Sequence, residues 1–532
     1  MKMIPILEKI ITKIESVPLT FPRFLATITA LVIIRIFLEG FSSPIFDIPN
    51  YTALLLVSPL FYLNAILAFM ILLFLFTRLP LQKLAPFSLL GFLVIFIPPL
   101  IDLFSDKKWF VPALLVDTSN VGEKFFTFLI DTSQLSLTWG ARIQLILLIG
   151  AMVFFVALKT RKIWKAILSG VIFYAVVFVL TAIVSLVAMA ILSLQKGVWE
   201  VSTLEILDWL VNSRDSLLVA YADANVYSSF LIALIFIPLL LIQSFIFYRL
   251  ISPKKFRSLL TAIRPTRWLT QIFLFGAGAF FAFSRLENTD IFSPQFILSL
   301  IAAGSAILFS WLFGVFLNDI ADADIDRVTN PQRPIPRGII SVAEMRNLAI
   351  VAGLITFFSS FVLGYKTFFV FLVILAIGYL YSTPPLRLKK WLFVSNLAMG
   401  ATGALMFTAG YLMFNANNSL VNLPPAVSLL VFVATTLLAS VKDLKDFAGD
   451  KVGGAYTALT VWGEKKGKLV IALMAFAAIM LFPLILRRPD LFWISLGFGA
   501  AEIFIILDKR SRELWVFGTI FIYVFLVYLI AF

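Results

Sequence analysis

The segment "FILSLIAAGSAILFSWLFGVFLNDIADADID", residues 296–326, joins a membrane-length apolar stretch to a row of carboxylates. Its apolar part is long enough to cross a bilayer as a helix. Asp319, Asp322 and Asp326 then follow an i, i+3, i+7 spacing, which places three acidic side chains on one helix face. Because like charges on one face repel each other, the spacing indicates that a cation neutralises them.

The apolar pattern recurs along the whole chain. Of its 532 residues, 61% are hydrophobic and 14% are charged, whereas about 25% of a soluble domain is charged. We therefore expect an all-α polytopic membrane protein, whose helices satisfy their own backbone hydrogen bonds in lipid. Fifteen spans are predicted, at 22–38, 52–76, 86–104, 142–158, 166–194, 226–247, 268–284, 293–317, 345–364, 367–382, 392–413, 424–441, 467–486, 491–507 and 514–531.

The connections between the predicted spans alternate in charge. The loops "TRLPLQKL" (77–84), "KTRKIWK" (159–165) and 248–268 are basic, whereas the loop 195–225 is acidic. Because Lys and Arg collect in cytoplasmic loops, the alternation predicts a multi-pass protein of the cell membrane with its N-terminus in the cytoplasm and its C-terminus outside. The same bias accounts for the net charge of +14, so we predict no nucleic-acid partner.

The long basic segment 248–268 divides the chain into two predicted domains. Residues 1–250 form an N-terminal membrane module of unknown function with about six spans, and residues 251–532 form a domain with about nine. No acidic repeat or phosphate-binding loop occurs in the N-terminal module. It either docks a protein partner or gathers a lipid substrate, and the sequence leaves both alternatives open.

The chain contains no Cys and no His. Their absence excludes disulfides, thiolate or imidazole metal sites, and catalysis by Cys or His. A metal ion would have to be bound by oxygen atoms, which favours Mg²⁺, with Mn²⁺ or Ca²⁺ as alternatives.

A second acidic stretch, "KDLKDFAGD" (442–450), repeats the spacing of the first at Asp443, Asp446 and Asp450. Both stretches begin at the predicted cytoplasmic end of a span. Mg²⁺ bound by carboxylates often binds substrate phosphates as well, so the pair predicts a phosphate-bearing ligand. Basic residues in and around the two stretches could neutralise such a ligand: Arg333, Arg337, Arg387, Lys389 and Lys442. A lipid diphosphate, with its tail among the apolar spans, fits this combination.

These motifs resemble those of the UbiA-type intramembrane prenyltransferases. "NDIADADID" matches the family pattern NDxxDxxxD, and "DLKDFAGD" matches DxxDxxxD. "RPIPRG" (333–338) and "YSTPPLRLK" (381–389) resemble two further family stretches. The resemblance covers about residues 250–532 and implies a nine-helix bundle around a central cavity, preceded here by the six-helix module.

The resemblance also implies a reaction. It is the Mg²⁺-dependent transfer of a prenyl group from an isoprenyl diphosphate to a lipophilic acceptor, such as a lipid, quinone or chlorophyll-type precursor. By position, the implied metal ligands are Asp319, Asp322, Asp326, Asp443, Asp446 and Asp450. Of these, Asp319, Asp322, Asp443 and Asp446 are the expected catalytic residues. The expected substrate-binding residues are Asn318, Arg333, Arg337, Arg387, Lys389 and Lys442.

Three other functions compete with prenyl transfer. A related branch of the family transfers phosphoribose to a polyprenyl phosphate. A divalent-cation transporter would also carry acidic residues, but such residues are expected near the bilayer midplane. A non-catalytic scaffold would not need to keep both acidic stretches intact. The sequence therefore favours a prenyltransferase and leaves its acceptor unidentified.

Overall fold

The computed structural model of the chain describes residues 9, 11–42, 48–104, 114–131, 137–212, 224–283, 294–415, 419–508 and 513–531. Every regular element in this described part is an α-helix or a short 3-10 helix. Thirteen of the helices are long and apolar enough to cross a membrane by length and composition. The predicted all-α polytopic membrane fold is confirmed, while the exact number of spans in each half stays a prediction.

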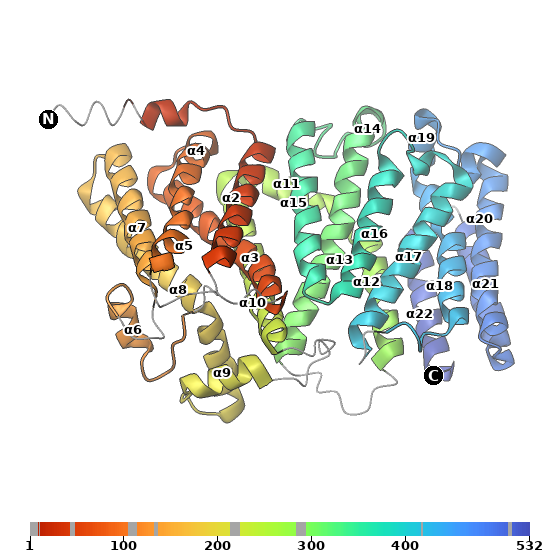
Figure 1. The fold of residues 1–532 in the computed structure, drawn as a ribbon. Coiled ribbons are helices and arrows are strands. Elements are labelled where there is room, and N and C mark those ends of the chain that lie inside the picture. Colours follow the sequence, from red (N-terminus) through yellow and green to blue (C-terminus); the bar gives the residue numbers. More distant parts are fainter. Residues whose placement is uncertain are drawn as a thin grey trace. The chain divides into compact units, whose positions relative to one another are not determined.

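The chain divides into two compact units, one built mainly before Ile251 and the other mainly after Ser252. Figure 1 labels the helices of each unit. The first unit contains α2 (Phe21–Ser42), α3 (Ile48–Thr77), α4 (Leu81–Phe92), η1 (Leu93–Phe96), α5 (Ile97–Ile101), η2 (Asp102–Phe104), α6 (Val121–Thr127), α7 (Trp139–Thr160), α8 (Ile163–Lys196), α9 (Thr203–Asn212) and α10 (Ala224–Ile251).

The interior of the first unit holds a buried ion pair. Arg35 and Glu39 lie one turn apart on α2, and their side chains are only 7% and 11% exposed. The Arg35 guanidinium also donates to the carbonyl oxygen of Ile95 and lies 5.3 Å from the ring centroid of Tyr62. Charged side chains within membrane helices usually face the protein interior and pair in this way. The pair therefore ties α2 to α3 and η1.

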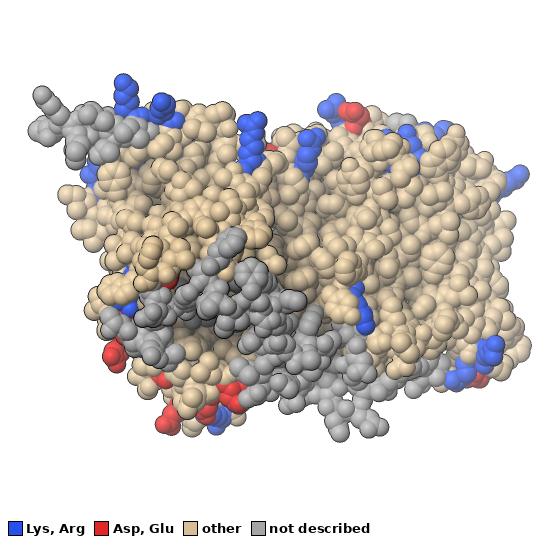
Figure 2. All heavy atoms as spheres, viewed as in Figure 1, with Lys and Arg blue, Asp and Glu red and all other residues tan. Residues whose placement is uncertain are grey.

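The second unit contains the predicted family region. Its elements are α11 (Pro253–Ala262), α12 (Pro265–Phe283), α13 (Pro294–Ala321), α14 (Ala323–Thr329), α15 (Val342–Phe361), α16 (Tyr365–Ser382), η3 (Leu388–Lys390), α17 (Leu392–Phe414), α18 (Pro425–Leu438), η4 (Ala439–Lys442), α19 (Asp443–Gly453), α20 (Ala458–Ile485), η5 (Pro489–Leu491), α21 (Phe492–Leu507) and α22 (Glu513–Ala531). Figure 2 shows that the visible side of this unit is nearly free of charge, with Lys, Arg, Asp and Glu near the helix ends. An uncharged band of this kind suits contact with lipid hydrocarbon.

Two glycines allow α12 and α17 to approach each other closely. A Cβ atom on Gly278 would lie 1.9 Å from the carbonyl oxygen of Phe407, and one on Gly410 would lie 1.9 Å from that of Phe275. Neither distance is sterically possible, so the two backbones meet where side chains are absent. Small residues at such crossings are typical of membrane helix pairs. Both helices also line the cavity described next, so this contact sets part of its width.

Candidate active site

A cavity of about 520 Å³ lies within the second unit. Its apolar walls come from α12, α13, α16, α17, α18, α20 and α22, and include Phe273, Phe281, Trp311, Ile374, Met399, Phe407, Leu430, Ile479, Phe482 and Val527. Its polar lining includes Arg264, Arg267, Asn318, Asp322, Asp326, Arg333, Tyr381, Arg387, Lys389, Ser395, Lys442, Asp443 and Asp450. An apolar cavity that carries a cluster of charged groups fits an amphipathic ligand with a charged head.

The first acidic stretch, residues 318–326, spans the junction between α13 and α14. The sequence predicts one continuous helix face here, but the structure interrupts the helix at Asp322, between α13 and α14. Asp322 and Asp326 line the cavity, whereas Asp319 lies behind the lining and is only 2% exposed. Two of the three carboxylates therefore line the cavity, and Asp319, which is as buried as Asp326, does not.

Protein cations neutralise all three of these carboxylates. Arg264 and Arg333 form ion pairs with Asp319, and Arg333 also lies 2.5 Å from an oxygen of Asp326. The sequence predicted that a cation neutralises these carboxylates, and Arg264 and Arg333 provide such cations in this structure. Three of the basic residues that were expected to face a phosphate ligand, Arg333, Arg387 and Lys389, contact acidic residues in this structure.

Two further cations converge on Asp322 from the segment that follows α16. The Arg387 guanidinium lies 2.9 Å from one oxygen of Asp322 and donates to the carbonyl oxygen of Ala321 at 3.0 Å. The Lys389 ammonium contacts the other oxygen of Asp322 and donates to the side-chain oxygen of Asn318 at 2.9 Å. Burial lowers the pKa of the Lys389 ammonium, and the charge of Asp322 opposes that shift. The predicted binding residues Asn318, Arg387 and Lys389 thus meet at the cavity.

The backbone of Arg387 is held in an unfavourable conformation. Its φ of 41° and ψ of 57° lie in the left-handed region, which costs a residue other than glycine about 1–2 kcal/mol. Arg264, which binds Asp319, also has a positive φ of 51°. Arg78, Arg161 and Arg487 share this conformation and do not line the cavity, so a positive φ by itself does not mark the site.

The second acidic stretch, residues 442–450, packs beside the first. Its helix, α19, lies so close to α14 that a Cβ atom on Gly453 would lie 2.9 Å from the Ile325 side chain. Asp443 and Asp450 line the same cavity as Asp322 and Asp326. The side chain of Asp446 is outside the described residues. The structure thus brings the two acidic stretches, more than a hundred residues apart in sequence, to one cavity.

The oxygen atoms at this place are of the kind that bind a hard cation. They are carboxylate oxygens and the amide oxygen of Asn318, which are the ligands that Mg²⁺ prefers. Within the described residues, no three carboxylates already stand close enough together to hold an ion. An ion would therefore have to exchange with Arg or Lys partners at the first acidic stretch. The residues fit Mg²⁺, and its binding requires the side chains to rearrange.

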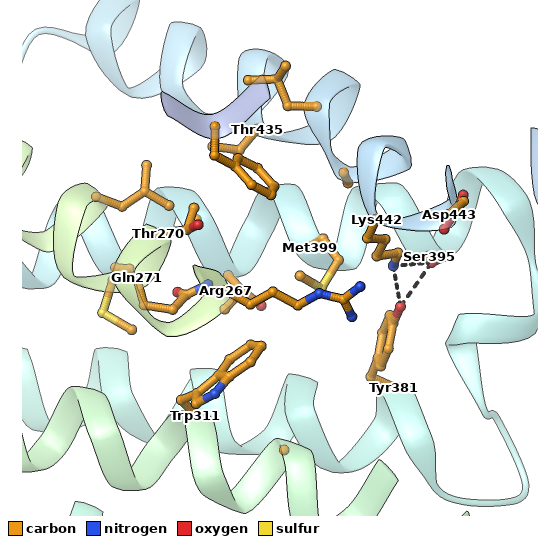
Figure 3. A pocket seen from close by; sticks show the side chains of 18 of the residues that line it. Arg267, Thr270, Gln271, Trp311, Tyr381, Ser395, Met399, Thr435, Lys442 and Asp443 are labelled. Carbon is orange, nitrogen blue, oxygen red and sulfur yellow. Dashed lines mark hydrogen bonds between the residues drawn. The ribbon is translucent and has the colours of Figure 1, made fainter. Parts of the chain in front are cut away.

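The predicted substrate-binding residue Lys442 lines the same cavity together with two hydroxyl residues that the sequence did not predict, Tyr381 and Ser395 (Figure 3). The Lys442 ammonium donates to the hydroxyls of Tyr381 on α16 and Ser395 on α17, and these two hydroxyls lie 3.2 Å apart. Tyr381 begins the stretch "YSTPPLR", which provides a sequence signal for it. Nothing in the sequence distinguishes Ser395 from other serines in spans.

One predicted substrate-binding residue lies elsewhere. Arg337 is exposed and is not among the residues that line the cavity. It follows the turn that begins at Asn330, and Arg333, four residues earlier, is the arginine of this segment that reaches the cavity. The "RPIPRG" stretch therefore contributes one of its two arginines to the site.

Comparison with known proteins finds a family match within the second unit. Residues 272–526 match the family model described as UbiA prenyltransferase family, which confirms the resemblance for the C-terminal half. Digeranylgeranylglyceryl phosphate synthase of Saccharolobus solfataricus is 31% identical over 199 residues, which are 37% of this chain and 66% of that protein. The chloroplastic 2-acylphloroglucinol 4-prenyltransferase of Humulus lupulus is 32% identical over 200 residues, 36% of this chain and 47% of that protein.

The chain spans slightly less than two thirds of the length of its archaeal relative in Saccharolobus. Among solved structures, a UbiA homolog from Archaeoglobus fulgidus bound to GPP and Mg²⁺ is 20% identical. It covers 51% of this chain and 99% of its own length, with a TM-score of 0.42. The family match begins at residue 272 and so lies outside residues 1–250.

Proposed function

Because residues 272–526 match the UbiA prenyltransferase family, we propose that the protein transfers a prenyl group from an isoprenyl diphosphate to a lipophilic acceptor. Residues 251–532 form the domain that carries this activity, and residues 1–250 form an accessory membrane module. One observation supports the proposal above all. Two acidic stretches, together with Arg333, Arg387 and Lys389, line a cavity whose remaining walls are apolar.

The charged end of the cavity is proposed to bind the diphosphate. Asp322, Asp326, Asp443 and Asp450 would hold Mg²⁺, with Asp446 added from its place in the sequence motif. When bound, Mg²⁺ supplies positive charge that stabilises the departing diphosphate. Arg387 and Lys389 already converge on Asp322, so they stand where they can donate hydrogen bonds to diphosphate oxygens.

The apolar walls are proposed to hold the prenyl tail and to keep water away from the reacting carbon. Side chains such as Phe273 and Phe407 provide this lining, and an aromatic ring face also attracts a cation. In the reaction, the allylic C–O bond of the donor breaks and the electron pair leaves with the diphosphate. The acceptor atom then bonds to the allylic carbon and releases its proton. With no His in the chain, that proton passes to a carboxylate, water or diphosphate.

The site is proposed to face the cytoplasm. The acidic stretches lie in loops that the charge alternation assigns to that side, and the basic segments of the same loops follow the positive-inside rule.

Prenyl transfer can be measured with the purified full chain in lipid nanodiscs, using labelled geranylgeranyl diphosphate and a panel of lipid, quinone-precursor and phenolic acceptors. We expect turnover that requires Mg²⁺ or Mn²⁺. Asp322→Asn and Asp443→Asn should each lower turnover by about 100-fold or more, as expected when charge stabilisation in a transition state is lost.

Asp324→Asn is the matched control, because the side chain of Asp324 is 92% exposed and, within the described residues, forms an ion pair only with Arg327. It should keep turnover within about twofold, as expected for an exposed surface pair. Turnover that survives chelation, or that Asp324→Asn lowers as much as Asp322→Asn, would contradict the proposal. Labelled phosphoribosyl diphosphate in the same assay, and metal uptake into proteoliposomes, test the two alternative functions.

A further inference from the structure

The helix α11 packs one of its faces against the second unit. Leu259 and Ala262 belong to the same apolar cluster as Leu312 and Phe316 of α13. Both of these α13 residues lie in the last turns of the membrane-length helix Pro294–Ala321. Because α11 packs beside the end of a span, we place it at the level where the hydrocarbon of a bilayer meets the lipid head groups.

The connections on either side of α11 keep it near that level. Ser252 alone separates it from α10, whose candidate span ends at Ile251. Ile263 and Arg264 alone separate it from α12, which carries the predicted span 268–284. A helix of 10 residues is about 15 Å long. With both ends tied this closely to membrane-length helices, α11 cannot extend far from the bilayer surface.

The other face of α11 is exposed and basic. Lys254, Arg257 and Thr261 are exposed and follow an i, i+3, i+7 spacing, which places them on one side of the helix. Leu260 lies beside them and is 49% exposed. A helix face that combines cations with an exposed apolar side chain is typical of helices that bind anionic bilayers.

The third cation of α11, Lys255, is balanced within the protein. It forms an ion pair with Glu344 at the start of α15. The Glu344 carboxylate also accepts hydrogen bonds from Ser341, which caps α15. Within the described residues, Lys254 and Arg257 form no such pair. They are therefore the cations of this helix that remain for an anion outside the chain.

The end of α11 leads directly into the candidate active site. The carbonyl oxygen of Ile263 accepts a hydrogen bond of 2.8 Å from the Trp311 indole, and Trp311 lines the cavity. The next residue, Arg264, forms an ion pair with Asp319 of the first acidic stretch. A displacement of α11 would therefore move both a side chain of the cavity wall and a cation that balances Asp319.

We propose that Lys254, Arg257 and Leu260 form a docking face for anionic lipid head groups, and that this contact keeps Arg264 in place at Asp319. The two cations attract the head groups, and Leu260 enters the boundary between head groups and acyl chains. The partner is a lipid of the bilayer and not a soluble anion. The effect on turnover rests on the proposed prenyl transfer, whereas the docking face itself does not.

A spin label on α11 tests the docking face directly. Because the native chain has no Cys, Thr261→Cys provides a single labelling site in the full chain. The labelled chain is compared in nanodiscs of phosphatidylcholine and in nanodiscs that also contain phosphatidylglycerol. Phosphatidylglycerol should lower the mobility of the label and reduce its accessibility to a water-soluble relaxation agent by about twofold or more. Lys254→Gln combined with Arg257→Gln should abolish this response.

Lys465→Gln combined with Lys466→Gln is the matched control, because both lysines are exposed and lie on the same predicted side of the membrane. The control should keep the response of the label, and soluble glycerophosphoglycerol should not reproduce it. A label that behaves alike in both lipid mixtures, or a response that survives the α11 substitutions, would overturn the docking face. So would a response that the control also loses or that the soluble phosphodiester reproduces.

Turnover tests the link between α11 and the active site. Phosphatidylglycerol should raise prenyl transfer by the wild-type chain at least about fivefold, the lower end of typical coupling between two sites. The α11 double variant should lose this dependence, and the control should keep it. A response of the label without any change in turnover would overturn the link. A chain without prenyl transfer in any lipid would refute the proposed function, while the spin label would still decide the docking face.

Discussion

Replacing Arg333 by Met tests how the charges of the first acidic stretch are balanced. The Arg333 guanidinium lies 2.5 Å from an oxygen of Asp326 and 3.4 Å from one of Asp319. Asp319 also has Arg264 as a partner, whereas the Asp326 carboxylate has, in the described part of the chain, only the Asn330 amide as a further side-chain partner. The substitution therefore leaves one buried carboxylate without a cation.

The expected loss of stability follows from burial. The Asp326 side chain is 4% exposed and that of Arg333 is 20% exposed, so solvent screens the pair weakly. Removing one partner of a buried pair costs about 3–5 kcal/mol, and we take the lower end because the Arg333 side chain is partly exposed. At about 2 °C per kcal/mol for a unit of this size, the unfolding temperature should fall by about 6 °C. Arg327→Met removes the exposed contact with Asp324. This control substitution should change the unfolding temperature by about 1 °C or less.

Thermal unfolding in detergent, with and without Mg²⁺, measures both effects. Mg²⁺ should raise the unfolding temperature of Arg333→Met more than that of the wild-type chain, because the ion no longer competes with the guanidinium for Asp326. Adding Asp326→Asn to Arg333→Met should recover most of the loss, since both members of the pair are then neutral. A normal unfolding temperature for Arg333→Met, or a Mg²⁺ effect equal to that in the wild-type chain, would refute this account of the charges.

Three further predictions concern packing, orientation and domain structure. Gly410→Val should lower the unfolding temperature by several degrees because its Cβ would lie 1.9 Å from a backbone oxygen of α12, whereas Gly304→Ala, with open space around it, should be tolerated. In intact cells, an impermeant thiol reagent should label Val421→Cys and spare Lys465→Cys, and the reverse pattern would contradict the predicted orientation. A chain that begins at Lys254 should fold and retain prenyl transfer, and a well-folded but inactive product would place the first unit within the catalytic machinery.

The sequence predicted the elements that depend on local pattern. Membrane-length apolar runs predicted helices, since a span must satisfy its own backbone hydrogen bonds. The repeated spacing of acidic residues predicted that the two stretches act together, and the structure places Asp322 and Asp443 in the lining of one cavity. The basic stretch "YSTPPLRLK" likewise predicted Arg387 and Lys389 at the site, and both contact Asp322.

Features that depend on long-range contacts could not be predicted from local pattern. Helical spacing alone gave one continuous acidic face, whereas packing of α14 beside α19 accompanies the interruption at Asp322. The pairing of Arg264 with Asp319 joins residues 55 positions apart. The place of Ser395 in the polar cluster of the cavity also depends on a long-range contact, because η4 brings the Lys442 ammonium within hydrogen-bond distance of its hydroxyl. Arg337 belongs to the motif-like stretch "RPIPRG", but its side chain is exposed in the structure.

The central claim is that the two acidic stretches jointly hold a divalent metal with a diphosphate. Electron paramagnetic resonance of Mn²⁺ bound to the full chain, in the presence of inorganic diphosphate, measures this directly through the coupling of the ion to phosphorus-31. We predict that the wild-type chain gives a bound Mn²⁺ signal with phosphorus coupling. This signal should be lost or weakened at least tenfold in both Asp322→Asn and Asp443→Asn, and it should be kept in Asp324→Asn. A phosphorus-coupled Mn²⁺ signal that neither substitution weakens, or no bound Mn²⁺ at all, would contradict it.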